Sequence, residues 1–286
     1  MKFLYFLIFI VVISTTIYSQ SFRPLSFSWQ SAGSFQSSGD DESLTKAGNV
    51  LKHINVLSFS AKAPVYRDTA SLTIITQLDY SRTDLRSNYS FHTADAALIL
   101  YTLLGRNYDM FAMYQPKFSA GMQTGLTSSA CTYNFATGFG RQFSNSLYGA
   151  IGVYYIHSFG QGLTFPLVTL KWSINPEAVL MVEFPDQVSV TYKLMRDLKL
   201  SLYNRYEANQ FRLDDKGIKP EFYRYISTTL GLNISYNLLD NLWADISAGY
   251  YLNNKANMFT RNELITTTNF KKATMIRISA AYEISN

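Results

Sequence analysis

Hydrophobic and polar residues alternate along most of the chain. In "ISTTLGLNISYNL" (226–238), one set of alternate positions carries mainly Ile, Leu and Tyr, whereas the other carries only Ser, Thr, Gly and Asn. Successive side chains of a strand point to opposite faces, so this pattern predicts a strand with one apolar and one polar face. The apolar face must pack either on a protein core or against lipid.

Similar segments recur along the chain, separated by turn residues, and no amphipathic helix is expected among them. Fourteen strands are predicted, at 23–33, 53–64, 70–80, 92–103, 108–120, 128–140, 147–158, 163–173, 178–184, 188–195, 198–212, 222–238, 242–253 and 272–284. An alternative count is twelve, with residues 20–50 forming an N-terminal tail or plug instead of a first strand and a loop.

The connections between these strands alternate in length. Tight turns are expected at 64–69, 105–107, 142–145, 175–177, 196–197 and 240–241, and longer loops at 33–49, 81–91, 121–129, 159–162, 214–222 and 253–269. Tight turns at one end and longer loops at the other are typical of outer-membrane barrels, whose tight turns face the periplasm. The link "PDQ" (185–187) is short although it belongs to the loop set. It predicts a low point in the rim and a side entry for lipid-like ligands.

Charged residues fall on the polar faces of the strands. The candidates for lining a lumen are Asp79, Glu183, Lys193, Lys199, Arg205, Glu207, Asp245, Arg277 and Glu283. In a soluble core each charge would need a partner, whereas in a barrel lumen the charges meet water or one another. The apolar faces are therefore expected to contact lipid. The fold class predicted is an all-β transmembrane antiparallel up-and-down barrel, and the mixed charges indicate either an ion-pair network that closes the lumen or a weakly selective pore.

The N-terminus indicates export. Residues 1–19 ("MKFLYFLIFIVVISTTIYS") have one lysine, an apolar run too short for a membrane-spanning helix and a polar end, as a signal peptide does. The barrel domain is expected at 20–286.

Composition excludes several kinds of function. The single cysteine, Cys131, excludes an internal disulfide framework, and the net charge of +5 includes no basic run, so nucleic acid is not an expected partner. No metal and no cofactor are expected.

The residues also offer little catalytic chemistry. The histidines His53, His92 and His157 come from non-neighbouring strands. His157 and Ser158 are adjacent in a strand and point to opposite faces, so a His/Ser hydrolase site is not expected. The three tryptophans, Trp29, Trp172 and Trp243, suit the aromatic girdles of a barrel.

Two stretches carry a resemblance to a known family. They are "LTFPLVTLKWSINPEAVLMVEFPDQVSVTYKLMRDLKLSLYNRYE" (163–207) and "SFSAKAPVYRDTASLTIITQLDYS" (58–81). In these stretches the sequence resembles an uncharacterised family of outer-membrane β-barrel proteins of Bacteroidetes-type bacteria. The resemblance implies a barrel in the outer membrane of a Gram-negative bacterium and no particular activity.

A channel is the function that this pattern favours. A barrel of fourteen strands is intermediate between filled barrels and wide porins, so passive or facilitated passage of a small or apolar molecule through the lumen is expected. The alternative is a structural or surface-interaction barrel that acts through its outer loops; a lipid hydrolase is a weaker one. The partners expected are outer-membrane lipid, lipopolysaccharide, the barrel-assembly machinery and an unidentified small solute.

Overall fold

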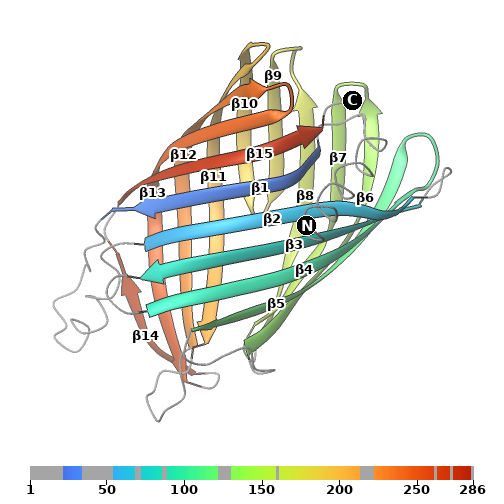
Figure 1. Cartoon of the computed structure of the whole chain (residues 1–286). Helices are drawn as coiled ribbons and strands as arrows, with labels where there is room; N and C mark the ends of the chain where they lie inside the picture. The colour runs from blue at the N-terminus through green and yellow to red at the C-terminus, as the bar shows by residue number, and fades with distance from the viewer. Residues whose placement is uncertain are drawn as a thin grey trace, which may run out of the picture.

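The chain forms a β-barrel in the computed structural model (Figure 1). The structure describes residues 22–33, 54–67, 72–85, 89–121, 130–158, 161–212, 222–260, 263–270 and 273–284. Among these residues there is no helix that is long and apolar enough to cross a membrane. The expected signal peptide at 1–19, residues 34–49 of the predicted loop 33–49 and residues 214–221 of the predicted loop 214–222 lie outside the described residues.

Fifteen strands make up the barrel. They are β1 (Phe22–Ala32), β2 (Ile54–Arg67), β3 (Leu72–Leu85), β4 (Tyr89–Leu103), β5 (Tyr108–Gly121), β6 (Cys131–Ser144), β7 (Leu147–Ser158), β8 (Gln161–Ser173), β9 (Ala178–Phe184), β10 (Gln187–Met195), β11 (Leu198–Arg212), β12 (Phe222–Leu239), β13 (Leu242–Thr260), β14 (Glu263–Asn269) and β15 (Thr274–Ile284). Each wall strand pairs antiparallel with its neighbours in sequence, as a meander does.

The wall closes with fourteen strand positions. The first part of β13, from Leu242 to Tyr250, pairs with β15, whereas its far part, from Lys255 to Thr260, pairs with β14. The short strand β14 and β15 therefore occupy one position in the wall. β1 pairs with β2 on one side and with β15 on the other, so the wall has no first or last edge. The prediction of a fourteen-stranded barrel is confirmed, and the alternative of twelve is wrong.

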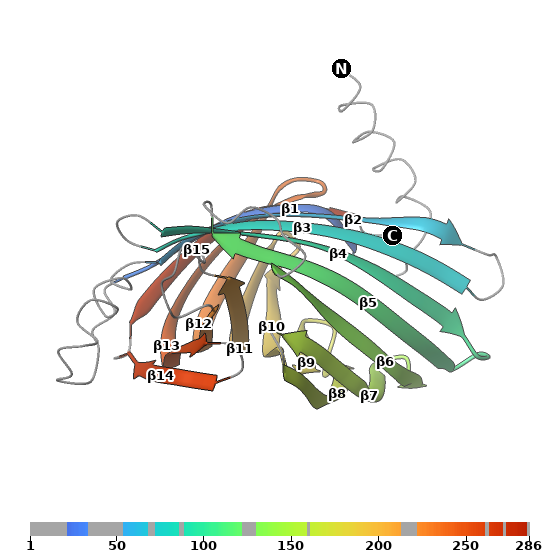
Figure 2. The ribbon, with the colours of Figure 1, turned by 90° about the horizontal axis from the view of Figure 1, so that it is seen from below.

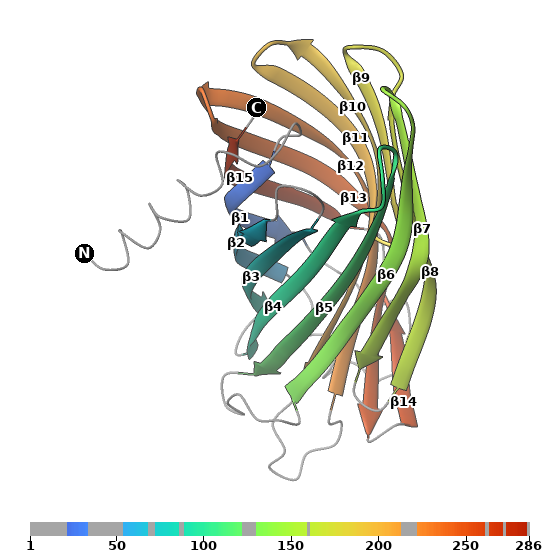
Figure 3. The ribbon, with the colours of Figure 1, turned by 90° about the vertical axis from the view of Figure 1, so that its right-hand side faces the viewer.

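The two ends of the barrel differ, as Figure 3 shows from the side. At the end that we call the turn end, β6 is joined to β7 through 145–146, β10 to β11 through 196–197 and β12 to β13 through 240–241. The opposite end is called the loop end. These connections are tight because a hairpin of two residues needs only a turn, often with Asn or Asp. The two-residue turn at 185–186, between β9 and β10, points toward the loop end instead.

Two predicted loops are in fact largely strand. Residues 81–85 and 89–91 extend β3 and β4, whose register runs without interruption to Leu85 opposite Tyr89. Residues 253–260 and 263–269 form the far part of β13 and β14. The sequence prediction was wrong here because both faces of a strand become polar where it leaves the apolar layer.

The outer surface of the barrel is apolar. On β12 the side chains of Leu230, Leu232, Ile234 and Tyr236 are exposed, whereas the residues between them face inward. An exposed apolar belt of this kind is what a lipid-facing barrel surface presents. The apolar face of 226–238 therefore does not pack on a protein core.

Two of the three tryptophans lie on this outer surface. Trp29 and Trp172 are 40% and 43% exposed, as expected for aromatic girdles. Trp243 is only 6% exposed and lies inside the barrel, so its assignment to a girdle is wrong. It pairs with Ala281 and Asn237 in the wall, both on inward-facing positions.

Candidate functional site: the interior of the barrel

The nine charged candidates all lie on strand faces opposite the apolar belt. Asp79 is on β3, Glu183 on β9, Lys193 on β10, Lys199, Arg205 and Glu207 on β11, Asp245 on β13, and Arg277 and Glu283 on β15. Six of the nine join two ion-pair networks that are described below. Of the other three, Asp79 accepts a hydrogen bond from Gln77, Glu183 acts electrostatically on Lys62, and Lys193 lies exposed near the turn end. Their part in the passage of a solute is still a prediction.

The first network lies near the turn end and is centred on Glu283. Arg23 Nε lies 3.0 Å and Lys199 Nζ 3.4 Å from the two carboxylate oxygens of Glu283. Arg23 also contacts Asp245, at 3.1 Å. Lys199 Nζ lies 3.8 Å from the centre of the Trp243 ring, a cation–π distance. Two cations thus balance two carboxylates whose side chains are almost wholly buried.

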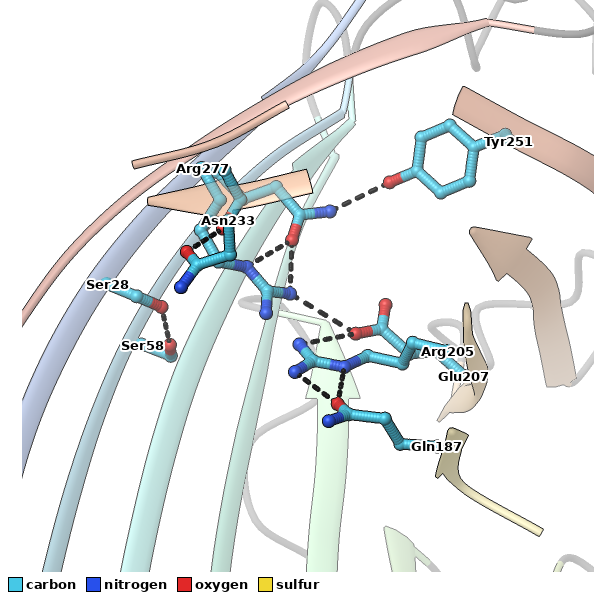
Figure 4. Close-up of polar contacts among 10 residues, drawn as sticks. Ser28, Ser58, Gln187, Arg205, Glu207, Asn233, Tyr251 and Arg277 are labelled. Carbon is cyan, nitrogen blue, oxygen red and sulfur yellow. Dashed lines mark hydrogen bonds and ion pairs between the residues drawn. The ribbon is translucent and has the colours of Figure 1, made fainter. Parts of the chain in front are cut away.

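The second network lies further toward the loop end and is drawn in Figure 4. Glu207 Oε1 lies 3.2 Å from Arg277 Nη2 and 3.8 Å from Arg205 Nη1, so it links β15 to β11. Arg277 also donates two hydrogen bonds to Gln30 on β1, one of them at 2.8 Å. Arg205 donates to Gln187 on β10, at 2.7 and 2.9 Å. A chain of polar contacts therefore runs through the interior from β1 to β10.

A third polar group, on the β4–β6 side, was missed by the sequence analysis. Asp95 accepts a hydrogen bond of 2.7 Å from Gln115, and Gln115 accepts one of 3.1 Å from Asn134. Lys117 on β5 reaches across the interior to Asn209 on β11, at 3.5 Å. The signal was present, because Asp95 lies between Ala94 and Ala96 and is thus opposite an apolar position on its strand.

Apolar side chains fill one part of the interior at the loop end. The cluster combines Ala32, Ile54, Phe91, Tyr203, Phe211, Tyr223, Tyr225, Tyr251, Ala256, Phe270, Ala273 and Met275. Phe91 on β4 and Phe211 on β11 come from opposite walls, yet their ring centres are only 4.5 Å apart. Tyr223 stacks on Phe91, with the ring centres at 6.4 Å. This cluster, which we call the aromatic plug, closes the interior between β4 and β11.

The opposite walls also meet through their backbones. Arg212 at the end of β11 forms a parallel bridge with Ala120 at the end of β5. Figure 2 shows the end of β11 beneath β5, and Figure 1 shows the two tips together at the loop end. The cross-section of the barrel is therefore divided at this end, where β5 and β11 meet. One lobe contains the aromatic plug, and the other is bounded by β5–β8.

The described histidines lie on the outer surface with aromatic partners. His92 Nδ1 lies 2.6 Å from the hydroxyl of Tyr80, and His157 stacks on Tyr133 with ring centres 4.6 Å apart. His53 is outside the described residues. Among the residues that the structure describes, no three His, Cys, Asp or Glu side chains are grouped as metal ligands.

One family model matches residues 77–283, which is most of the barrel wall, and it is described as a domain of unknown function, DUF6268. The chain belongs to this family. No curated protein matches the chain in sequence.

Solved structures of outer-membrane barrels are similar to the chain in fold. The TodX monoaromatic hydrocarbon channel, in a deltaS2 mutant, is 8% identical with a TM-score of 0.50, over 95% of this chain and 92% of that one. The NanC porin is 9% identical with a TM-score of 0.44, over 90% and 98% of the two chains. Outer membrane phospholipase A from Escherichia coli is 11% identical with a TM-score of 0.43, over 96% of each chain. At such identities the likeness concerns the fold, which is that of outer-membrane proteins of Gram-negative bacteria.

Proposed function

We propose that this protein is an outer-membrane channel that carries a small solute and is closed in the conformation described here. The observation that carries the proposal is the interior, where charges of both signs pair with one another beside the aromatic plug. Glu207 bridges Arg277 and Arg205, and Glu283 bridges Arg23 and Lys199. A filled structural barrel needs no such charges, because well-packed apolar side chains give similar or greater stability at lower cost.

The proposed orientation follows the two kinds of connection. The tight turns face the periplasm, the loop end faces the outside, and residues 1–19 direct export. Lipid and lipopolysaccharide contact the outer surface, and assembly machinery inserts the barrel. The proposal contains no enzymatic step. His92 and His157 have tyrosine neighbours on the outer surface, which is consistent with a proposal that assigns them no role in the interior.

The test is the conductance of the refolded protein in a planar bilayer. Wild-type protein is expected to give rare, small current steps, because the aromatic plug and the second network both obstruct the interior. A variant with Arg277→Gln and Phe211→Ala weakens both obstructions and is expected to give larger, more frequent steps with weak ion selectivity. The matched control is Asp84→Asn, which removes an exposed pair with Arg82 on the outer surface and leaves the current unchanged.

Two results would contradict the proposal. Large, stable wild-type currents equal to those of the double variant would show that the plug and the network do not close the lumen. Silence of both proteins, with heat-modifiable migration on gels as evidence of folded barrels, would exclude passage through the lumen. That second result would favour the alternative function, a barrel that binds surface partners through its loops.

A further inference from the structure

Two strands of the wall are too short to reach the loop end. β9 and β10 lie between β8 and β11 (Figure 2) and turn back at residues 185–186. β9 pairs only with Val168–Ser173 of β8, and β10 pairs only with Leu198–Arg205 of β11. Beyond the turn, one last backbone hydrogen bond joins Tyr206 to Asp186, at 2.8 Å. Among the described residues, no strand pairs with Gln161–Leu167 of β8 on this side, and the edge of β11 beyond Tyr206 pairs only at its tip, where Arg212 meets Ala120 of β5. The wall therefore has a side opening here.

β11 bends into the barrel beside this opening. Its tip bridges Ala120 of β5, on the opposite wall. As a result, side chains on the outward faces of β11 and β12 no longer look toward lipid at this level. Tyr206, Ala208 and Ile226 instead face the inward side chains of β5–β8 across a cavity of about 310 Å³. This cavity, which we call the side groove, has the size of a small-molecule site.

The side groove changes from polar to apolar along the wall. On β5 and β6 it is lined by Gln115, Lys117 and Asn134, whose neighbouring contacts hold them in place. At the same level of the wall, β7 and β8 line the groove with Ile156, which pairs with Asn134, and with Leu163, which pairs with Ile156. The polar side is thus deep in the barrel, and the apolar side is next to the opening between β8 and β11.

The groove continues onto the lipid-facing surface. A second hollow, of about 440 Å³, lies around the turn between β9 and β10 and includes the exposed apolar side chains of Phe184 and Val188. The two hollows share Phe165, Pro185, Asp186 and Tyr206. These four residues therefore form the boundary between the outer hollow and the side groove.

We propose that the side groove binds a single-chain amphiphile with a carboxylate head, which enters sideways from the membrane. The apolar chain lies against Leu163, Phe165 and Ile226 and extends through the opening into the outer hollow. The head lies against Lys117 and the amides of Gln115 and Asn134. Among the lining residues the two cations Lys117 and Arg224 outnumber the one carboxylate, Asp186, and the nearby carboxylate of Asp95 already accepts a hydrogen bond from Gln115. This balance favours an anionic head over a cationic one.

Native mass spectrometry of the refolded full-length barrel in a neutral detergent tests the proposal. Three probes share a tail of twelve carbons: dodecanoate, dodecanol and dodecyltrimethylammonium. One dodecanoate is expected to bind per barrel, with an affinity about tenfold above that of dodecanol, because hydrogen bonds to charged groups are the stronger ones. Dodecyltrimethylammonium is expected to bind at least tenfold more weakly than dodecanoate.

Variants locate the site. Ala208→Trp fills the groove from β11 and is expected to lower the affinity for dodecanoate at least tenfold. Leu202→Trp is the matched control, because it lies on the same face of the same strand but outside the groove, and it is expected to bind as wild type does. Lys117→Met is expected to lower the affinity for dodecanoate to that for dodecanol and to leave dodecanol unchanged.

Three outcomes overturn the proposal. Equal affinities for the three probes would remove the carboxylate assignment, and this comparison needs only the wild-type protein. Equal losses in Ala208→Trp and Leu202→Trp would remove the location, and the absence of bound dodecanoate would remove the site. Binding is measured without any current, so its failure leaves the conductance test of the proposed channel standing, and the reverse also holds.

Discussion

A charge introduced on the outer face of β12 should reveal how deep each position lies in the bilayer. Leu232 and Leu238 are the same residue type on the same strand and the same face, and their side chains are 51% and 52% exposed. Leu232 pairs with Leu202 and Ala248 in the middle of the apolar belt. Leu238 is close to the tight turn at 240–241. The two positions therefore differ mainly in depth.

The structure gives the depth difference. A strand rises about 3.3 Å per residue and a barrel strand is tilted by about 40°, so each residue advances about 2.5 Å along the bilayer normal. The outward positions of β12 from Thr228 to Leu238 then span about 25 Å, which is the height of the apolar band of such barrels. Leu232 lies about 10 Å from the Thr228 edge of this band, near its middle, and Leu238 lies at its turn-end edge.

An arginine should therefore cost different amounts at the two positions. Leu232→Arg is expected to lower the free energy of unfolding by about 2–4 kcal/mol, and Leu238→Arg by about 0–1 kcal/mol. The measurement is equilibrium unfolding in guanidinium from phospholipid vesicles, followed by tryptophan fluorescence. Equal costs at the two positions, or a larger cost at Leu238, would refute the placement of the apolar belt in lipid.

Two further predictions concern the interior. Glu283→Gln leaves Arg23 and Lys199 without their shared carboxylate and is expected to lower the free energy of unfolding by about 1–3 kcal/mol. The control Asp84→Asn removes the exposed pair with Arg82 and is expected to change the free energy of unfolding by less than about 1 kcal/mol. Similar values for both variants would contradict the buried setting of Glu283. Gly152→Ala places a methyl group against the backbone of Thr137 and is expected to cost about 1–3 kcal/mol in the same unfolding assay, so an unchanged midpoint would refute the close approach of β6 and β7.

The architecture could be predicted because two different environments act on the two faces of each strand. Lipid excludes charge from one face, so Leu232 and Ile234 alternate with Asn233 and Ser235 in a regular pattern. The turns between strands are equally readable, since pairs such as Asp240–Asn241 adopt tight hairpins. Strand number and the side of each charge follow from these two local signals.

The contacts inside the barrel could not be predicted in the same way. Alternation places Glu207 and Arg277 on inward faces, but it gives no information about which charges meet, because their positions are 70 residues apart in sequence. Trp243 illustrates the same limit. Its residue type favours a girdle and alternation places it on the inward face with Asp245, but no local signal indicates that Lys199 of β11 stacks on its ring.

The early turn of the short strands β9 and β10 explains both the side groove and the aromatic plug. Beyond residues 185–186 the edge of β11 would face hydrocarbon with unpaired backbone groups, which is costly in a membrane. The inward bend removes that edge from lipid and brings Arg212 to Ala120, and it also brings Phe211 against Phe91. A single feature, the early turn of β9 and β10, therefore accounts both for the closed lobe and for the groove behind it. A solute entering through the side opening would reach Lys117 and Asn209, at the boundary of the charged interior, without displacing the plug.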